Sequence, residues 1–195
     1  MRITGGSARG RKLASPRSGQ IRPTCDRVRE ALFNIVGQRI AGSRVLDLFA
    51  GTGAIGIEAL SRGAASVLFV DQSPEAGRLI ETNLRACIAR PRAAFAALNL
   101  ATSPHLHPLQ TAAAADGRFD LAIMDPPYQK NLAQRVLAMV EEADILAEDG
   151  LIVVEEHRSV ALPESVASLA LIDHRRYGET GLWFFAPNRP HAAHE

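Results

Sequence analysis

The sequence predicts an α/β fold with a mostly parallel β-sheet that is covered by helices on both faces. From residue 44 onward, short apolar segments alternate with helical segments, which is typical of such sheets. The last two apolar segments, residues 168–176 and 181–186, have no helix between them, so we expect them to form an antiparallel hairpin. A glycine-rich loop follows the first apolar segment, where such sheets bind their ligands.

The composition is that of an ordinary soluble protein. With 195 residues, of which 47% are apolar and 22% charged, the chain suits one domain with a small appendage. No apolar run approaches the roughly 20 residues of a membrane span, and we see no signal peptide at the N-terminus. The two cysteines, Cys25 and Cys87, form no metal-binding pattern. We expect a cytoplasmic protein with reduced thiols and no metal, and we expect it to be a monomer.

Positive charge is concentrated at the N-terminus. Residues 1–44 contain ten arginines and lysines but only two acidic residues, Asp26 and Glu30, which gives this segment a net charge of +8. Since the whole chain has a net charge of +1, the remainder has a net charge of −7. A basic segment on an acidic body suggests a polyanionic partner.

The N-terminal segment is predicted to be an extension of the main domain. Residues 1–23 are rich in Gly, Arg, Ser and Pro, and we expect an irregular arm with a short hairpin through residues 2–4 and 11–13. A helix then begins at Thr24 or Asp26, either of which can cap it. Its apolar stripe consists of Val28, Leu32, Ile35 and Val36, and its other faces carry Arg27, Arg29 and Glu30. We assign the domains as 1–41 (basic extension and helix), 42–187 (main domain) and 188–195 (polar tail).

The main domain is predicted to contain seven strands. We expect strands at residues 45–49, 66–70, 93–98, 119–124, 151–155, 168–176 and 181–186. Helices are expected from the glycine loop to about Arg62, from Pro74 to about Ala89, and over residues 130–147. Residues 100–116 give no clear pattern.

The glycine-rich loop is predicted to bind a nucleotide-like cofactor. Gly51, Gly53 and Gly56 match the spacing G-x-G-x-x-G between a strand and a helix, and Asp71 lies 20 residues beyond Gly51. Glycines let the backbone approach a ligand closely, and the acidic residue suits ribose hydroxyls. By this motif alone, the loop could bind a dinucleotide.

Asp47 favours S-adenosylmethionine over a dinucleotide. It lies within the strand, four residues before Gly51, where a carboxylate would repel a pyrophosphate but attract the ammonium group of a methionine moiety. Asn99 follows the third strand, where such enzymes commonly place a polar residue against the adenine amino group; it could equally be a cap or loop residue. The sequence thus predicts a Rossmann-like, class I S-adenosylmethionine-dependent methyltransferase.

The segment Asp125-Pro126-Pro127-Tyr128 predicts methylation of an amino group on a planar system. The amino nitrogen of a nucleobase is a poor nucleophile because its lone pair is conjugated. Asp125 can accept one N–H of that group, and a carbonyl of the proline segment, which has no competing N–H, can accept the other. Tyr128 can stack on the face of the base. This segment has no role in hydride transfer.

The whole chain resembles the bacterial 16S ribosomal RNA guanine-N2 methyltransferase family, RsmD. The motifs that carry the resemblance are Arg2-Ile-Thr-Gly-Gly with Arg9-Gly-Arg-Lys-Leu, Arg22-Pro-Thr-Cys-Asp-Arg-Val-Arg-Glu-Ala-Leu-Phe-Asn, the glycine loop from Asp47 to Arg62, and Asp125-Pro-Pro-Tyr. The resemblance implies methylation of N2 of guanine 966 in the RNA of the small ribosomal subunit, with S-adenosylmethionine as donor and no metal. Where the family more often has glutamate and aspartate, this chain has Asp71 and Asn99.

The candidate functional residues fall into three sets. The catalytic set is Asp125, Pro126, Pro127 and Tyr128, and the donor-binding set is Asp47, Gly51, Gly53, Asp71 and Asn99. The RNA-binding set is Arg2, Arg9, Arg11, Lys12, Arg22, Thr24 and Arg27; Arg22 and Thr24 are expected near the donor or the base. The basic residues could instead form a solvated face, and Arg27, Arg29 and Glu30 could form internal ion pairs.

Several other functions stay open at this point. An adenine-N6 or glutamine-amide methyltransferase uses a similar proline motif. A nicotinamide-dependent oxidoreductase would share the glycine loop, and a noncatalytic RNA-binding assembly factor would share the basic extension.

Overall fold

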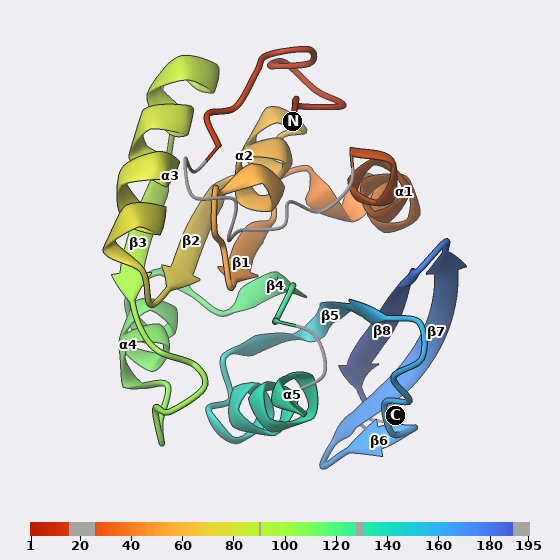
Figure 1. Cartoon of the computed structure of the whole chain (residues 1–195). Coiled ribbons are helices and arrows are strands. Elements are labelled where there is room, and N and C mark those ends of the chain that lie inside the picture. Colours follow the sequence, from red (N-terminus) through yellow and green to blue (C-terminus); the bar gives the residue numbers. More distant parts are fainter. Residues whose placement is uncertain (16–25, 90, 128–130, 189–195) are drawn as a thin grey trace, which may run out of the picture.

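The computed structural model describes residues 1–15, 26–89, 91–127 and 131–188 (Figure 1). Its centre is an eight-stranded sheet with the strand order β3-β2-β1-β4-β5-β8-β7-β6. The strands are β1 (Arg44–Leu48), β2 (Ser66–Asp71), β3 (Ala93–Ala97), β4 (Phe119–Met124), β5 (Leu146–His157), β6 (Ser165–Val166), β7 (Leu169–Tyr177) and β8 (Thr180–Pro187). The helices are α1 (Asp26–Val36), α2 (Ala54–Ser61), α3 (Pro74–Cys87), α4 (His107–Asp116) and α5 (Leu132–Glu142), with a 3-10 turn η1 (Gly37–Ile40) after α1.

The topology reverses between β1 and β4. Strands β1 to β5 are parallel, whereas β8 and β7 are antiparallel to their neighbours. From β1 the chain moves outward to β2 and β3, and then returns to the other side of β1 to form β4 and β5. Loops that leave β1 and β4 at their carboxyl ends therefore diverge, and ligands of open α/β sheets bind at such a point.

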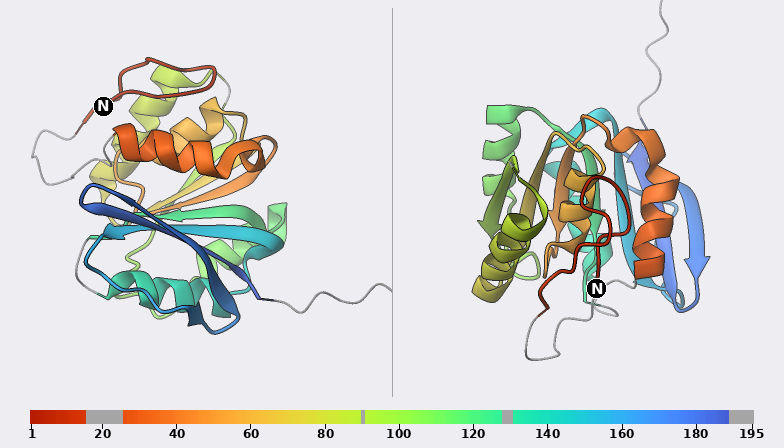
Figure 2. Two further views of the ribbon diagram at one scale, coloured as in Figure 1. Left: turned by 90° about the vertical axis from the view of Figure 1, so that its right-hand side faces the viewer. Right: turned by 90° about the horizontal axis from the view of Figure 1, so that it is seen from above.

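Two hydrophobic cores lie on opposite faces of the sheet. One contains Val45, Phe69 and Ile123 and packs beneath α1, α2 and α3. The other contains Leu46 and Met124 and packs against α4 and α5. This alternation along each strand follows from the two-residue period of β-structure. Figure 2 shows the resulting three layers, with helices on both sides of the sheet.

The predicted fold class is confirmed, with three differences in its elements. Helix α4 forms within residues 100–116, whose sequence shows no clear pattern. The two-residue strand β6 adds an eighth strand at the edge next to β7. The predicted helix over residues 130–147 is too long, because α5 ends at Glu142 and β5 already begins at Leu146. Asp144 has a left-handed backbone conformation, with φ of 50°, which ends the helix. The extra length of β5 forms an irregularity opposite β4, where the register shifts between Phe119 and Leu121.

The N-terminal arm is packed against the domain rather than loosely attached. The expected hairpin is present, since the Ile3 N–H donates to the Arg11 carbonyl (3.0 Å) and the Gly10 N–H donates to the Ile3 carbonyl (2.8 Å). Ile3, Ala8 and Leu13 are buried and belong to the same hydrophobic core as the buried residues of α1, α2 and α3. We refer to residues 1–13 as the N-terminal hairpin.

The faces of α1 differ from the expectation. Ile35, placed in the apolar stripe, is 39% exposed, and Phe33 is buried instead. Arg29, expected on an outer face, is fully buried, where its Nε lies 2.8 Å from Glu58 Oε2 and its Nη2 lies 2.9 Å from Asp26 Oδ1. The alternative interpretation, an internal ion pair, is therefore confirmed for Arg29. Arg27 and Glu30 are exposed.

None of the helices in the described ranges has both the length and the apolar character needed to cross a membrane.

Candidate active site

Carboxylates from four neighbouring strands gather at the carboxyl edge of the sheet. Met124, the last residue of β4, is paired with Leu48 of β1 and with Val154 of β5, and Leu48 is paired with Val70 of β2. The next residues along β2, β4 and β5 are Asp71, Asp125 and Glu155, so these three acids lie in one row. Asp47 lies on β1, two residues before the position of the chain that falls in that row, and it pairs with Ile123.

Asp47 is the most strongly perturbed of these acids. Its side chain is 1% exposed, and Oδ2 accepts a hydrogen bond from the Gly56 N–H at 2.9 Å. Burial raises the pKa of Asp47 to about 7; the hydrogen bond from Gly56 opposes this shift, and the charges of Asp125 and Asp71 add to it. The carboxylates of Asp47, Asp71 and Asp125 are thus close enough to influence one another. A group of three carboxylates favours the binding of a cation.

The glycine loop is held to Asp71. The Gly51 N–H donates to Asp71 Oδ2 at 2.9 Å, and the Ser73 N–H donates to Oδ1 at 2.8 Å. Gly51 and Gly53 have φ values of 52° and 76°, in the left-handed region that glycine adopts most readily. A Cβ on Gly53 would also lie 2.9 Å from Ile80 Cγ1. The loop is therefore a close-packed backbone cradle.

Phe49 has an unusual backbone conformation between the strand and this loop. Its φ of 63° is uncommon for a bulky side chain and is energetically costly. The adjacent Ala50 N–H donates to the Val70 carbonyl at 3.0 Å, which fixes the turn to β2. Such local strain is frequent at functional sites. Phe49 lies in the same row as Asp71 and Asp125.

Asn99 lies beyond β3 and makes a local turn. Its Oδ1 accepts the Ala101 N–H at 3.0 Å, and its carbonyl accepts the Ser103 N–H at 2.8 Å. This arrangement fits the interpretation of a loop asparagine, and the contact to adenine stays a prediction.

The Asp125 segment begins where β4 ends. Asp125 is half-buried, and its backbone N–H lies 3.4 Å from the Leu48 carbonyl of β1. Pro126 is buried and Pro127 is exposed. Tyr128 lies outside the described residues, as do Arg22 and Thr24, so their expected places near the base and the donor stay predictions.

The basic residues of the N-terminal hairpin are at the surface. Arg2, Arg9, Arg11 and Lys12 are exposed, as is Arg27 on α1. Arg11 also donates from Nη1 to the Ala86 carbonyl at the end of α3 (2.6 Å), so this side chain helps to attach the hairpin. The hairpin lies on the outer side of α2, on the α1–α2–α3 face (Figure 1).

Three buried polar residues, Glu58, Asn83 and Glu155, were not among the candidates predicted from the sequence. The signal for Asn83 is a polar residue within the apolar stripe of α3, where Ala76, Ile80 and Cys87 are also buried. The signal for Glu155 is a carboxylate that directly follows the apolar residues of β5, just as Asp125 follows β4. Glu58 gives no comparable signal.

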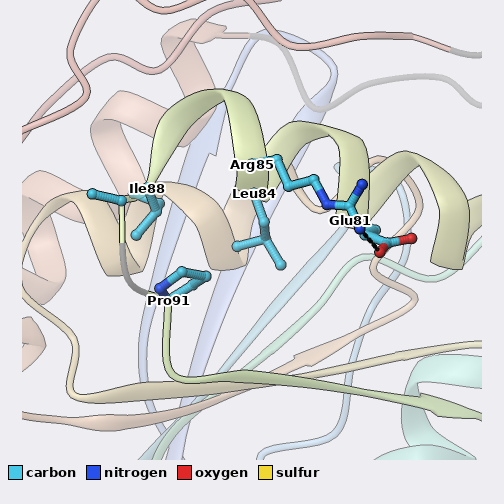
Figure 3. A pocket seen from close by; sticks show the side chains of 6 residues that line it. Glu81, Leu84, Arg85, Ile88 and Pro91 are labelled. Atoms are coloured by element: carbon cyan, nitrogen blue, oxygen red, sulfur yellow. Dashed lines mark hydrogen bonds and ion pairs between the residues drawn. The ribbon is translucent and has the colours of Figure 1, made fainter.

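A cavity of about 370 Å³ lies elsewhere, between the C-terminal half of α3 and the start of β3 (Figure 3). Its lining includes Leu84, Ile88 and Pro91, with the exposed Arg85–Glu81 ion pair beside them. None of the carboxylates at the carboxyl edge lines it. We therefore assign the candidate site to the carboxyl edge.

The strand order, the antiparallel end of the sheet and the glycine cradle with its acidic edge define the α/β fold of S-adenosylmethionine-dependent methyltransferases. The model of the family "Conserved hypothetical protein 95" matches residues 1–186. The chain belongs to this family, and the predicted relationship to RsmD is thereby confirmed.

Two curated relatives cover nearly the whole chain. "Putative rRNA methyltransferase YlbH" of Bacillus subtilis is 37% identical over 182 residues, which are 93% of this chain and 96% of the relative. "Ribosomal RNA small subunit methyltransferase D" of Escherichia coli is 36% identical over 174 residues, which are 88% of this chain and 82% of the relative.

Solved structures show the same fold. The structure titled "Putative methyltransferase yhhF from Escherichia coli" superimposes with a TM-score of 0.78 at 30% identity, covering 96% of this chain and 97% of that one. A hypothetical protein from Thermus thermophilus has a TM-score of 0.74 at 34% identity, covering 94% of this chain and 98% of that one.

Proposed function

We propose that this protein transfers a methyl group from S-adenosylmethionine to the exocyclic N2 of guanine 966 in 16S ribosomal RNA. The observation that carries the proposal is the close grouping of Asp47, Asp71 and Asp125 beside the glycine cradle. The relatives support the substrate class, since both are named as rRNA methyltransferases and one as acting on the small subunit. We further propose that the protein works as a monomer in the cytoplasm, without a metal, on RNA within the small subunit.

The residues of the cradle fit the proposed donor. Left-handed Gly51 and Gly53 bring the backbone close to a ligand, and Asp71 ends β2, at the position that suits ribose hydroxyls. Asp47 and its two acidic neighbours favour a ligand with positive charge, and their combined negative charge disfavours a pyrophosphate. When bound, S-adenosylmethionine supplies an electrophilic methyl group and carries a cationic sulfonium and an ammonium. A nicotinamide dinucleotide fits this acidic edge less well.

Asp125 and the prolines are proposed to hold the target amino group. Asp125 accepts one N–H, which draws electron density toward the nitrogen, and a carbonyl of Pro126 or Pro127 accepts the other. Prolines offer no N–H that could compete for the carboxylate. The site therefore contributes mainly positioning. The site lies at the carboxyl edge of the sheet. A guanine must therefore be unstacked from its neighbours in the RNA to reach this site.

The experiment is methyl transfer from labelled S-adenosylmethionine to small ribosomal subunits that lack the modification. We expect N2-methylguanine after digestion to nucleosides, at position 966 of the RNA. N6-methyladenine, labelled protein or the absence of any labelled product would overturn the assignment to guanine. Binding of a dinucleotide without binding of S-adenosylmethionine would support an oxidoreductase instead.

Substitution of Asp125 tests the role of the motif. Asp125→Ala is expected to bind the donor nearly as well as the unchanged protein and to lose transfer. Asp116→Ala is the control, because Asp116 is exposed on α4. Unchanged turnover of Asp125→Ala would refute the assigned role, and RNA binding with no turnover in the unchanged protein would favour an assembly factor.

A further inference from the structure

The side chain of Asn83 connects the segment after the N-terminal hairpin to the glycine loop. Asn83 lies on α3 and is 1% exposed. Its Oδ1 accepts the Ala14 N–H at 2.7 Å, and its Nδ2 donates to the Ala14 carbonyl at 3.2 Å and to the Thr52 carbonyl at 2.9 Å. Both N–H groups of the amide are therefore used, and they join two segments that are 38 residues apart in the sequence.

The contact to Thr52 fixes the middle of the cradle. Thr52 lies between Gly51 and Gly53, both of which are left-handed, and it belongs to no helix or strand whose hydrogen bonds would fix its carbonyl. The amide of Asn83 supplies that partner. Ile80, on the same face of α3, occupies the space beside Gly53. Helix α3 thus holds the cradle with one apolar and one polar contact.

The contact to Ala14 fixes the end of the hairpin. At its other end, the hairpin is attached to α2, where the Ser7 N–H donates to the Ser61 carbonyl (2.7 Å) and the Ala8 N–H donates to Ser61 Oγ (2.8 Å). A displaced hairpin would pull Ala14 away from Asn83. The amide would then lose two of its three hydrogen bonds inside the protein, and the position of Thr52 would be less well fixed.

We propose that Asn83 is a positioning residue that couples the docked N-terminal hairpin to the donor cradle, so that donor affinity depends on the hairpin. This inference rests on the proposed function, because it assumes that the cradle binds S-adenosylmethionine. By thermodynamic reciprocity, a bound donor also stabilises the docked hairpin and the basic residues that it presents to RNA. The hairpin is in this sense part of the donor site as well as an RNA-binding candidate.

The first test replaces Asn83 by Leu, which has a similar volume but makes none of the three hydrogen bonds. We expect the Kd for S-adenosylmethionine, measured by calorimetry, to rise roughly tenfold, because a buried carbonyl of the cradle loses its donor. The kcat at saturating donor should change less than twofold, which a general loss of structure would not produce.

Thr82→Ala is the control, because Thr82 is the exposed neighbour on α3 and bonds only locally to the Arg78 carbonyl. Asn83→Asp keeps the acceptor for the Ala14 N–H while removing the amide donors, and it replaces Asn83→Leu if that variant does not fold.

The second test displaces the hairpin from a distance. Gly6 has φ of 75°, and a Cβ there would overlap the Ser61 carbonyl and lie 2.7 Å from the Arg62 backbone nitrogen. Gly6→Ala should therefore weaken donor binding although Gly6 touches neither Asn83 nor the cradle. In the Asn83→Leu background the same change should add little, because the connection is already lost.

The outcomes separate this inference from the proposed function. An unchanged protein that binds no S-adenosylmethionine refutes the proposed function. An unchanged protein that binds it, together with folded Gly6→Ala and Asn83→Leu variants of unaltered donor affinity, overturns the coupling alone. Fully additive losses in the double variant also overturn it.

Discussion

The carboxylate of Asp47 accepts a hydrogen bond from the Gly56 N–H at 2.9 Å, within the first turn of α2. The unpaired N–H groups at the start of a helix favour negative charge, so this contact stabilises the ionised carboxylate. Burial and the nearby charges of Asp125 and Asp71 oppose it and raise the pKa of Asp47 to about 7. The ionised site is therefore destabilised until a cation compensates its charge.

We predict that Asp47→Asn stabilises the protein at pH 8 and weakens donor binding. The folded pKa of about 7 lies above the ordinary value of 3.8, so between these pH values the folded chain holds more protons than the unfolded chain. The contribution of Asp47 to stability therefore falls as the pH rises through this range. At pH 8 the variant should be more stable than the unchanged protein by up to about 4 kcal/mol. Urea unfolding at pH 5 and pH 8 measures the difference, and a gain that does not depend on pH would contradict the argument.

The second prediction concerns the buried ion pair between Arg29 and Glu58. Burial alone would raise the pKa of Glu58, but hydrogen bonds from Thr4, Arg29 and Arg62 outweigh it and hold the pKa below its ordinary value. Arg29→Met leaves Glu58 buried without its closest partner on α1, so we expect a loss of about 3–5 kcal/mol in the free energy of unfolding. Thermal or urea unfolding measures the loss.

Arg27→Met is the matched control for this pair. Arg27 is exposed on the same helix, so the change should cost less than about 0.5 kcal/mol. An equal loss in both variants would mean that helix propensity or net charge, rather than the buried pair, explains the effect.

The sequence predicted the strands of the sheet better than it predicted the faces of its helices. Residues 119–124 are bounded by polar residues and gave the limits of β4 correctly, because a short apolar run has few alternatives. Arg29 was placed at the surface because an isolated arginine is normally solvated, whereas in the structure it is paired with Asp26 and with the buried Glu58, 29 residues away in sequence. The end of α5 was missed because a left-handed Asp144 is not visible in an apolar pattern.

The sequence predicted those residues of the candidate site that lie at or near the carboxyl end of a strand. Asp47, Asp71 and Asp125 follow from strand assignment, because parallel strands bring their carboxyl ends to one edge. Asn83 does not, because its two backbone partners, Ala14 and Thr52, come close to it only through tertiary packing.

The third prediction tests the packing behind the cradle. A Cβ on Gly56 would lie 2.7 Å from Phe69 Cζ and 2.8 Å from Val67 Cγ1, both in the buried strand β2. Gly56→Ala should therefore destabilise the protein by about 1–3 kcal/mol, although alanine favours helix formation. It should also raise the Kd for the donor, because Gly56 would move away from Asp47. Both effects can be measured with the same purified variant.

Gly77→Ala is the control for this substitution. Gly77 is also helical, but a Cβ there would meet Phe95 Cε1 at 3.0 Å, and Phe95 is a partly exposed side chain that can move. We expect Gly77→Ala to be neutral or slightly stabilising. A similar loss in both alanine variants would mean that close packing behind the cradle is not the cause.

The last prediction concerns the exposed basic residues of the N-terminal hairpin. If Arg2, Arg9 and Lys12 contact phosphates, each alanine substitution should reduce the slope of log K against log salt concentration by about 0.7–0.9. Binding of ribosomal RNA at several salt concentrations measures this slope. Arg118→Ala is the control, because Arg118 is exposed at the start of β4 and is paired with Asp144.

Arg11 should behave differently, because its bond to the Ala86 carbonyl also attaches the hairpin. Arg11→Ala should therefore lower both RNA affinity and thermal stability. If the slopes of the Arg2, Arg9 and Lys12 variants equal that of the unchanged protein, the hairpin is a solvated basic face and RNA is bound elsewhere.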